Sequence, residues 1–245
     1  MISMHIEMYD RLEFEMTRLH VREWGDGDRV ALLIHGLSGS SGSWWQVGPA
    51  LAERGYRVLA PDLAGHGLSP RDGYSREQWA DDLLEAAPEN VELAIGHSLG
   101  GVLLAMIVEY LRPRRAIYED PAWYPADAGF GAAQPAIRAM KDWDADQLRA
   151  LSPHWSESNV QAELDALAAW DPDTTRMRYL ETAYLPTFPV VPSLILLADP
   201  SAMIPPPIAE RYRAAGFDTR TVPGTGHSIH TDDFEGFLAA LEGWA

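Results

Sequence analysis

Short, uninterrupted apolar runs alternate with longer amphipathic segments along most of the chain. The apolar runs occupy residues 30–34, 56–60, 91–95, 116–118 and 192–198. Runs of this kind are typical of parallel strands whose two faces are both covered by helices. Helical patterns lie between them, at residues 44–54, 75–87 and 102–111. The alternation of the two patterns predicts βαβ units and a mostly parallel central sheet with helices on both faces, an α/β fold.

The two ends of the chain extend this pattern. Residues 11–16 and 17–24 alternate apolar and polar positions, which predicts a pair of antiparallel edge strands. Near the other end, residues 217–222 predict a last strand. We expect a helix before it, over residues 207–215, and an amphipathic helix after it, over residues 232–244.

The alternation stops between residues 121 and 189, where no strand pattern is present. Residues 159–170 have a helical pattern, and the stretch is rich in aromatic side chains, namely Trp123, Tyr124, Trp143, Trp155, Trp170 and Tyr184. We predict a small helical cap at 121–189, inserted after the sixth strand into a core made of 1–120 and 190–245. The aromatic side chains form either the core of this cap or an apolar wall facing a ligand.

Composition narrows the chemistry. The 245 residues fit one large domain with an inserted subdomain, and the chain has no cysteine. Disulfides, thiol nucleophiles and cysteine-based metal sites are therefore excluded, which leaves serine, histidine and carboxylates. The formal net charge of −17 disfavours non-specific binding to nucleic acid or to anionic membranes.

The chain shows no targeting pattern. Residues 1–7 lack a basic start followed by an apolar run, and no apolar run approaches the length needed to span a bilayer. We therefore predict a cytoplasmic protein that does not bind membranes. The sequence does not indicate an oligomeric state.

The most informative motif is Gly-His-Ser-Leu-Gly at residues 96–100, between a predicted strand and a predicted helix. A serine at the tip of a sharp strand-to-helix turn holds its hydroxyl clear of the sheet, and flanking glycines allow the backbones to approach closely. The amide groups at the start of the helix then face any negative charge that forms there. The pattern predicts Ser98 as a nucleophile; the alternative is an ordinary turn with an incidental serine.

A serine nucleophile needs a base, usually a histidine whose orientation is fixed by an acid. All three groups should follow parallel strands, because the loops at the carboxyl ends of those strands meet at one edge of the sheet. His227 follows the last predicted strand, and Asp199 follows the strand that precedes it. We predict Ser98, His227 and Asp199 as a catalytic triad.

Four segments together resemble the α/β-hydrolase superfamily, in particular its cap-bearing serine esterases and lactonase-like enzymes. They are His35-Gly36, Asp-Leu-Ala-Gly-His-Gly-Leu-Ser at 62–69, Gly-His-Ser-Leu-Gly at 96–100 and Gly-Thr-Gly-His at 224–227. The resemblance covers the core on both sides of the cap and implies the same order of serine, acid and histidine. It also implies an oxyanion hole made of the backbone N–H groups of Leu37 and Leu99.

The acid is the member of the triad with competing candidates. Relatives commonly carry a Gly-x-x-Asp pattern after this strand, and an ungapped alignment places Ser201 where the aspartate belongs. Asp199 would then reach the histidine from slightly earlier in the loop. Some relatives place the acid after the preceding core strand instead, which here makes Asp120 and Glu119 the alternatives.

The combined prediction is a carboxylic ester hydrolase that acts on a small apolar or aromatic ester or lactone without a cofactor. A metal at His227 and His230 is disfavoured because no third ligand accompanies them. His35, His66 and His97 are predicted to brace the backbone. Epoxide hydrolases and haloalkane dehalogenases of this fold use aspartate as the nucleophile, so a serine disfavours both.

Other functions remain compatible with the same residues. Acyl transfer to an alcohol, hydrolysis of a carbon–carbon bond, hydroxynitrile lysis and perhydrolysis all use a serine, a histidine and an aspartate. A non-catalytic receptor for a small ligand is the alternative from a different class, since a fold alone does not establish a function.

Overall fold

The computed structural model describes residues 18–123, 129–176 and 186–245. The first predicted edge strand, at residues 11–16, lies outside the described residues, and so do Tyr124 and Tyr184. No helix in these three segments is long and apolar enough to cross a membrane.

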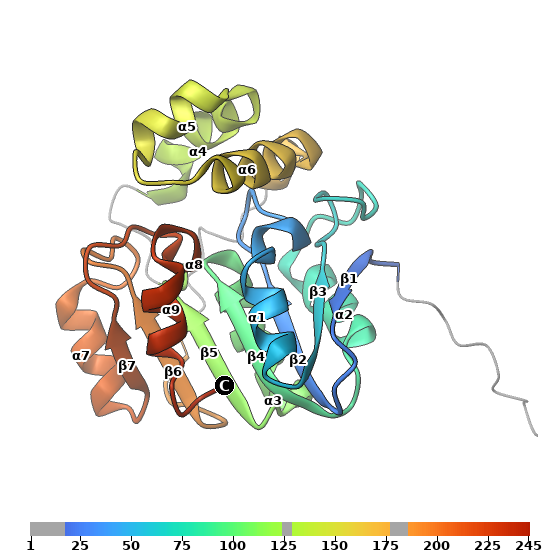
Figure 1. Ribbon diagram of the computed structural model, residues 1–245, viewed down its shortest axis with the longest axis vertical. Coiled ribbons are helices and arrows are strands. Elements are labelled where there is room, and N and C mark those ends of the chain that lie inside the picture. Colours follow the sequence, from blue (N-terminus) through green and yellow to red (C-terminus); the bar gives the residue numbers. More distant parts are fainter. Residues whose placement is uncertain (1–17, 124–128, 177–185) are drawn as a thin grey trace, which may run out of the picture.

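A seven-stranded sheet forms the centre of the described chain (Figure 1). Its strands are β1 (Val21–Trp24), β2 (Arg29–Ile34), β3 (Tyr56–Pro61), β4 (Val91–His97), β5 (Arg115–Glu119), β6 (Ser193–Leu197) and β7 (Asp218–Thr221). They lie side by side in the order β1-β3-β2-β4-β5-β6-β7. β1 runs antiparallel to β3, and every other pair is parallel. This confirms the predicted α/β fold with a mostly parallel sheet.

Helices cover both faces of the sheet, which explains why the central strands are apolar along their whole length. On one face, α2 (Arg76–Ala86), α3 (Leu99–Leu111) and α7 (Pro206–Ala214) contribute to one apolar cluster. On the other, α1 (Val47–Glu53), α8 (Ile229–Asp232) and α9 (Phe234–Ala240) contribute to a second (Figure 1). The inner strands therefore have no face left for water, whereas the edge strand β7 is partly exposed.

Two predicted helices are shorter in the structure than their patterns suggest. In the segment 44–54, a short 3-10 helix, η1 (Ser41–Trp44), ends at the segment's first residue and α1 begins at Val47, which places Pro49 in the first turn, where its missing amide hydrogen is tolerated. In the segment 232–244, α8 ends at the first residue and α9 covers Phe234–Ala240; between them the side chain of Asp233 accepts a hydrogen bond from the amide of Gly236 and caps α9.

The elements between β5 and β6 lie over the carboxyl ends of the parallel strands (Figure 1). They are α4 (Gly129–Ala139), η2 (Met140–Asp142), α5 (Ala145–Leu151), α6 (Glu157–Ala169) and η3 (Pro172–Arg176). Leu148, Val160, Leu167 and Trp170 form a small apolar cluster of their own within this cap. The domain boundaries at residues 121 and 189 stay a prediction.

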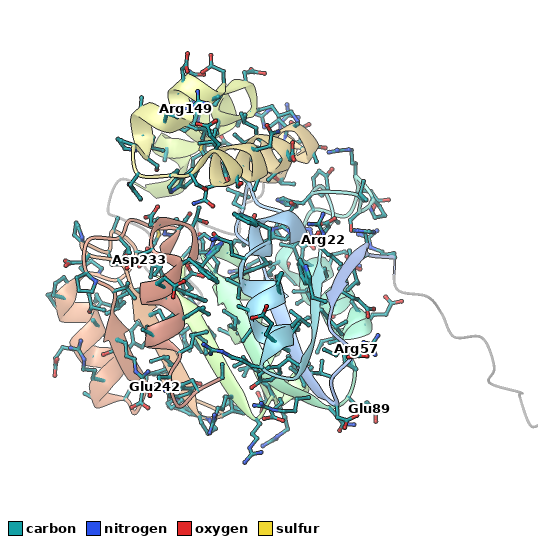
Figure 2. The ribbon with its side chains drawn as sticks, in the orientation of Figure 1. Arg22, Arg57, Glu89, Arg149, Asp233 and Glu242 are labelled. Atoms are coloured by element: carbon teal, nitrogen blue, oxygen red, sulfur yellow. The ribbon has the colours of Figure 1, made fainter. Side chains whose placement is uncertain are left out.

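The tryptophans of this region pack in two different apolar clusters. Trp170 is fully buried in the cap, and Trp143 and Trp155 pack against the same cluster. Trp123 belongs instead to the apolar cluster of the sheet. Charged side chains such as Arg149 of the cap point outward (Figure 2).

Candidate active site

Ser98 occupies a strained turn between β4 and α3. Its backbone angles are φ 51° and ψ −113°, in a region that side-chain-bearing residues rarely adopt. A β-carbon added to Gly96 would lie 2.4 Å from the carbonyl oxygen of Gly100, and one added to Gly100 would lie 2.1 Å from that of Ile34. The two glycines are therefore required by the close packing of strand and helix around the serine.

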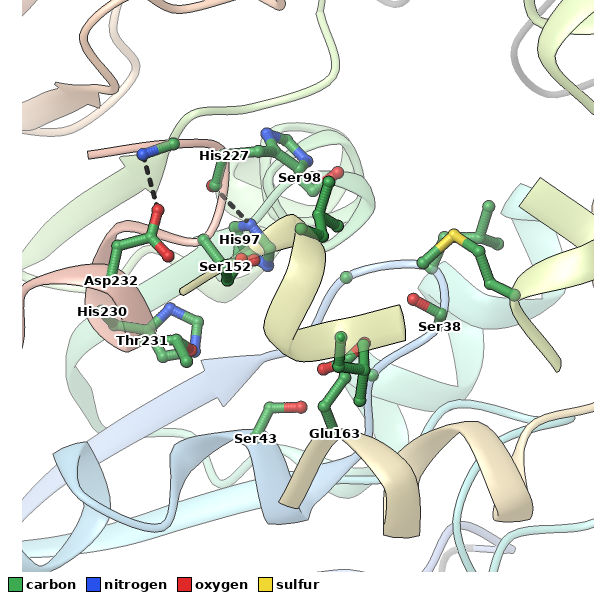
Figure 3. A pocket seen from close by; sticks show the side chains of 18 of the residues that line it. Ser38, Ser43, His97, Ser98, Ser152, Glu163, His227, His230, Thr231 and Asp232 are labelled. Atoms are coloured by element: carbon green, nitrogen blue, oxygen red, sulfur yellow. Dashed lines mark hydrogen bonds between the residues drawn. The ribbon is translucent and has the colours of Figure 1, made fainter. Parts of the chain in front are cut away.

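His227 lies in the loop after β7, next to Ser98 at the mouth of the same turn (Figure 3). Its Nδ1 is 2.6 Å from Oδ2 of Asp120, which follows β5 directly. The Asp120 side chain is 1% exposed and that of His227 is 38% exposed. An ionised carboxylate accepts only, so Nδ1–H donates and Nε2 is left free to act as a base.

The prediction that Asp199 pairs with His227 is wrong, because the histidine pairs with the alternative candidate Asp120. The Asp199 residue is exposed, and its backbone amide donates to the carbonyl of Thr225 at 3.0 Å. The loop after β6 directs Ser201 towards the site instead, and the Ser201 hydroxyl donates to Oδ1 of Asp120 at 2.5 Å. Both oxygens of the Asp120 carboxylate are thus occupied.

The position of Asp120 depends on its backbone. Its φ of 36° lies in the left-handed region, so the chain turns sharply as soon as β5 ends. The Asp120 amide donates to the carbonyl of Leu196 in the neighbouring strand at 2.8 Å. β5 and β6 are adjacent, so the two candidate acids follow neighbouring strands and only these local turns distinguish them.

A second carboxylate–histidine pair lies beside the first. Glu119 accepts from the backbone amide of His230 at 2.8 Å, and its two oxygens lie 2.8 and 2.9 Å from Nδ1 of the same residue. Burial by itself raises the pKa of Glu119, but the nearby histidines and the hydrogen bonds from His230 outweigh it and lower that pKa. The sequence patterns do not reveal this pairing.

Three other histidines hold the backbone around the site, as predicted. His97 donates from Nε2 to the carbonyl of His227 at 2.9 Å, and His35 donates from Nδ1 to the carbonyl of Gly36 at 2.7 Å. The Nε2 atom of His66 contacts the carbonyl oxygen of Leu37. Burial lowers the pKa of His97 and of His66 to about 3, so both rings are neutral near pH 7.

A cavity of about 730 Å³ lies between the cap and the sheet and is lined by both Ser98 and His227. Such a volume suits a small organic molecule. Most of the cap residues that line it are apolar, among them Ile137, Met140, Trp143, Leu148 and Trp155. Trp143 and Trp155 thus serve both predicted roles, since they pack against the cap's own cluster and also face the cavity.

Leu37 and Leu99 line the same cavity as Ser98. Among the described residues, neither backbone amide has a hydrogen-bond acceptor. Leu99 is the first residue of α3, where amide groups lack a partner within the helix. The two amides are therefore available to a ligand, and their role in an oxyanion hole stays a prediction.

One carboxylate connects the cap to the loop that carries His227. Oδ1 of Asp232 accepts from the indole of Trp155 at 2.7 Å and lies 3.2 Å from Nε2 of His154, both in the cap. Its Oδ2 accepts from the amide of Gly226, next to His227. Within the described residues, no group of three or more potential metal ligands is present.

Comparisons with known proteins agree with this arrangement. A family model described as "Alpha/beta hydrolase family" matches residues 31–240. A bifunctional epoxide hydrolase of Sus scrofa is 40% identical over 158 residues, which cover 61% of this chain and 28% of that protein. A probable esterase of Oryza sativa subsp. indica is 35% identical over 91 residues, 34% of this chain and 35% of that protein. The chain thus spans only about a third of these relatives.

Solved structures extend the likeness to nearly the whole chain. An esterase from Exiguobacterium antarcticum superposes with a TM-score of 0.75 and covers 92% of this chain and 94% of its own. Its sequence identity is 20%, so the likeness concerns the fold.

Proposed function

Because the chain belongs to the alpha/beta hydrolase family, we propose that it is a serine hydrolase that cleaves a carboxylic ester or lactone. The observation that carries the proposal is the 2.6 Å contact between His227 Nδ1 and Asp120 Oδ2, beside Ser98 on its strained turn. A serine, a histidine and a buried carboxylate in this relation are the parts needed for nucleophilic acyl transfer. The triad proposed is therefore Ser98, His227 and Asp120.

In the first step, Nε2 of His227 takes the hydroxyl proton of Ser98 as Oγ attacks the carbonyl carbon of the substrate. The imidazole becomes positively charged, and the buried Asp120 carboxylate stabilises that charge. Ser201 holds the other oxygen of Asp120, so the carboxylate keeps one orientation during the step.

The carbonyl oxygen gains negative charge during the attack. We assign the backbone amides of Leu37 and Leu99 as its hydrogen-bond donors, because both are available at the cavity that contains Ser98. The contact of His66 with the Leu37 carbonyl fixes the orientation of that residue's backbone. Loss of one such donor typically costs about 3–4 kcal/mol of transition-state stabilisation.

The tetrahedral intermediate then collapses, and His227 returns the proton to the leaving alkoxide oxygen. A water molecule, deprotonated by the same imidazole, attacks the acyl-enzyme and releases the carboxylic acid and the free Ser98 hydroxyl. These steps use side chains and backbone groups of this chain alone.

The nucleophile supports acyl chemistry over epoxide opening, although one of the relatives is named an epoxide hydrolase. A serine oxygen forms an ester with an acyl group, whereas epoxide opening in this fold proceeds through an ester on an aspartate. The name of the rice relative, a probable esterase, points in the same direction as Ser98.

The test compares wild type with Ser98→Ala on p-nitrophenyl butyrate. We expect the substitution to lower kcat by at least about 10³-fold, because no other group replaces the hydroxyl. Wild type should also be labelled by a fluorophosphonate at Ser98, as located by mass spectrometry of the digested protein. Wild-type turnover by Ser98→Ala, or labelling at a different residue, would overturn the proposal. A non-catalytic receptor would remain unlabelled.

A further inference from the structure

A carboxylate from the cap faces the cavity on the side away from the nucleophile. Glu163 projects from α6 into the cavity, across from Ser98 and His227 (Figure 3). Its side chain is half-buried, and it has no hydrogen bond or ion pair with any described residue. The cap residues that line the cavity are largely apolar. The carboxylate is therefore accessible from inside the cavity and has no partner there.

A histidine of the core, His230, borders the same cavity. His230 is 4% exposed and lines the cavity, and its Nε2 is buried without a hydrogen-bond partner among the described residues. Its Nδ1 is already used by Glu119. His230 is thus held by Glu119 and offers no exposed ring nitrogen to a ligand.

The two groups are close enough to influence each other. Burial raises the pKa of Glu163 to about 7, and His230 acts in the opposite direction. Among the described residues, no hydrogen bond joins the two side chains.

An unpartnered carboxylate in an apolar cavity is costly for the folded protein. Buried polar groups are nearly always hydrogen-bonded, and a buried charge without a partner is strongly unfavourable. The same helix carries Glu157 in full contact with water, where it pairs with Arg149. Glu163 contributes no such pairing to the fold, and this favours a role towards a ligand.

The chemistry of Glu163 defines what it binds. Its carboxylate supplies a negative charge and oxygen acceptors. The complementary group is positively charged and carries several hydrogen-bond donors. An alkylammonium group meets both conditions, and its pKa near 10 keeps it charged at neutral pH.

We propose that Glu163 forms a subsite for a protonated amine, so that the preferred ester carries an ammonium group at the end away from its scissile carbonyl. The preference for an ester rests on the function proposed above, whereas the subsite itself is a property of the cavity. Ser98 and the amides near it bind the carbonyl end, and the apolar cap residues surround the chain between the two ends.

The decisive experiment compares two esters of equal length. One is p-nitrophenyl 6-aminohexanoate and the other p-nitrophenyl heptanoate, in which a methyl group replaces the ammonium. For wild type at pH 8, we expect kcat/KM to be at least tenfold higher for the amino ester. Glu163→Gln should lower that ratio at least tenfold, because a neutral amide replaces the charge. Glu157→Gln, the same change on the outer face of α6, should leave the ratio within twofold of wild type.

The ratio should also depend on pH. The titratable side chains that line the cavity are His97, His154, Glu163, His227, His230 and Asp232. On the elements packed against α6, Lys141 donates to carbonyl groups at the end of that helix, and Arg149 pairs with Glu157. Glu163 ionises between pH 6 and pH 8, so wild type should favour the amino ester by up to about tenfold more at pH 8 than at pH 6. Glu163→Gln should abolish this rise.

A binding measurement separates failure of the subsite from failure of the proposed reaction. Calorimetry with n-hexylammonium chloride should give a Kd at least tenfold lower for wild type than for Glu163→Gln, whether or not esters are cleaved. Hydrolysis of both esters with the same ratio in wild type and Glu163→Gln would overturn the subsite and leave the reaction standing. Equal hexylammonium affinity in the two proteins would overturn it as well.

Discussion

Two carboxylate–histidine pairs lie at the end of the same strand. They have the same hydrogen-bonding pattern, but their histidines differ in exposure. Asp120–His227 and Glu119–His230 use consecutive acids at the carboxyl end of β5 and histidines three residues apart, and in both the carboxylate contacts Nδ1. The His227 side chain is 38% exposed, whereas that of His230 is 4% exposed. Both histidines are paired with a carboxylate, so the pairing alone does not make a histidine a base. What distinguishes His227 from His230 is that the second ring nitrogen of His227 is accessible.

The surroundings explain the difference. The ring of His230 stacks on Trp44 at 4.4 Å between centroids and meets the edge of Phe237 at 6.0 Å. His227 has one close aromatic neighbour among the described rings, His97, at 4.8 Å. His230 is therefore enclosed by the core of the protein, and His227 remains free on the side that faces Ser98.

Asp120→Asn tests the catalytic pair and should give the largest effect. An amide in place of the carboxylate favours the wrong tautomer of His227 and stabilises its charged form poorly, so kcat/KM for p-nitrophenyl butyrate should fall about 10⁴-fold. The melting temperature should change little, because the side chain keeps its shape. Asp199→Asn is the matched control and should stay within twofold of wild type. A larger loss in the Asp199 variant would reverse the assignment of the acid.

Glu119→Ala tests the enclosed pair and should act on stability. Removing one partner of a buried pair leaves the other uncompensated, and the free energy of unfolding should fall by about 3–5 kcal/mol. Urea denaturation followed by tryptophan fluorescence measures this. At a temperature where the variant is folded, fluorophosphonate should still label Ser98. Unchanged stability together with a loss of labelling would mean that the two pairs have the opposite roles.

His97 lies between the two pairs, and its substitution should give the smallest effect. The effect is a change in how the free energy of unfolding depends on pH. Burial holds its pKa at about 3 in the folded protein, below its ordinary value of 6.5, so the unfolded chain binds the extra proton. The stabilisation is complete above pH 6.5 and is lost as the pH falls towards 3, by up to about 1.4 kcal/mol per pH unit. His97→Gln keeps a donor for the His227 carbonyl and should flatten the fall in unfolding free energy between pH 6.5 and 4.5. An unchanged slope would show that His97 is already charged in the folded protein.

The fold was largely predictable because the central strands are buried on both faces. Apolar runs at 30–34, 56–60 and 91–95 match β2, β3 and β4 to within two residues at each end. Where burial is not the deciding factor, the boundaries differ. The tail pattern does not show that Asp233 ends one helix and caps the next.

The site was predictable where a motif describes the local backbone and not where tertiary packing decides. Ser98 and His227 come from motifs, and the structure brings them to one cavity. The acid could not be chosen from the pattern, because Asp120 and Asp199 both follow strands and the left-handed turn at Asp120 has no sequence signature. The position of Glu163 in the cavity could not be predicted either, because a helical pattern does not show which face of α6 meets the cavity.

The contact between Ser201 and Asp120 has an evolutionary consequence. The two side chains come from neighbouring strand ends, and their oxygens lie 2.5 Å apart. A carboxylate introduced at position 201 would therefore arise in the same place as the existing one. An ancestor carrying acids at both positions could lose either and keep a working histidine, so the acid can move between two points of the gene without any interval of inactivity.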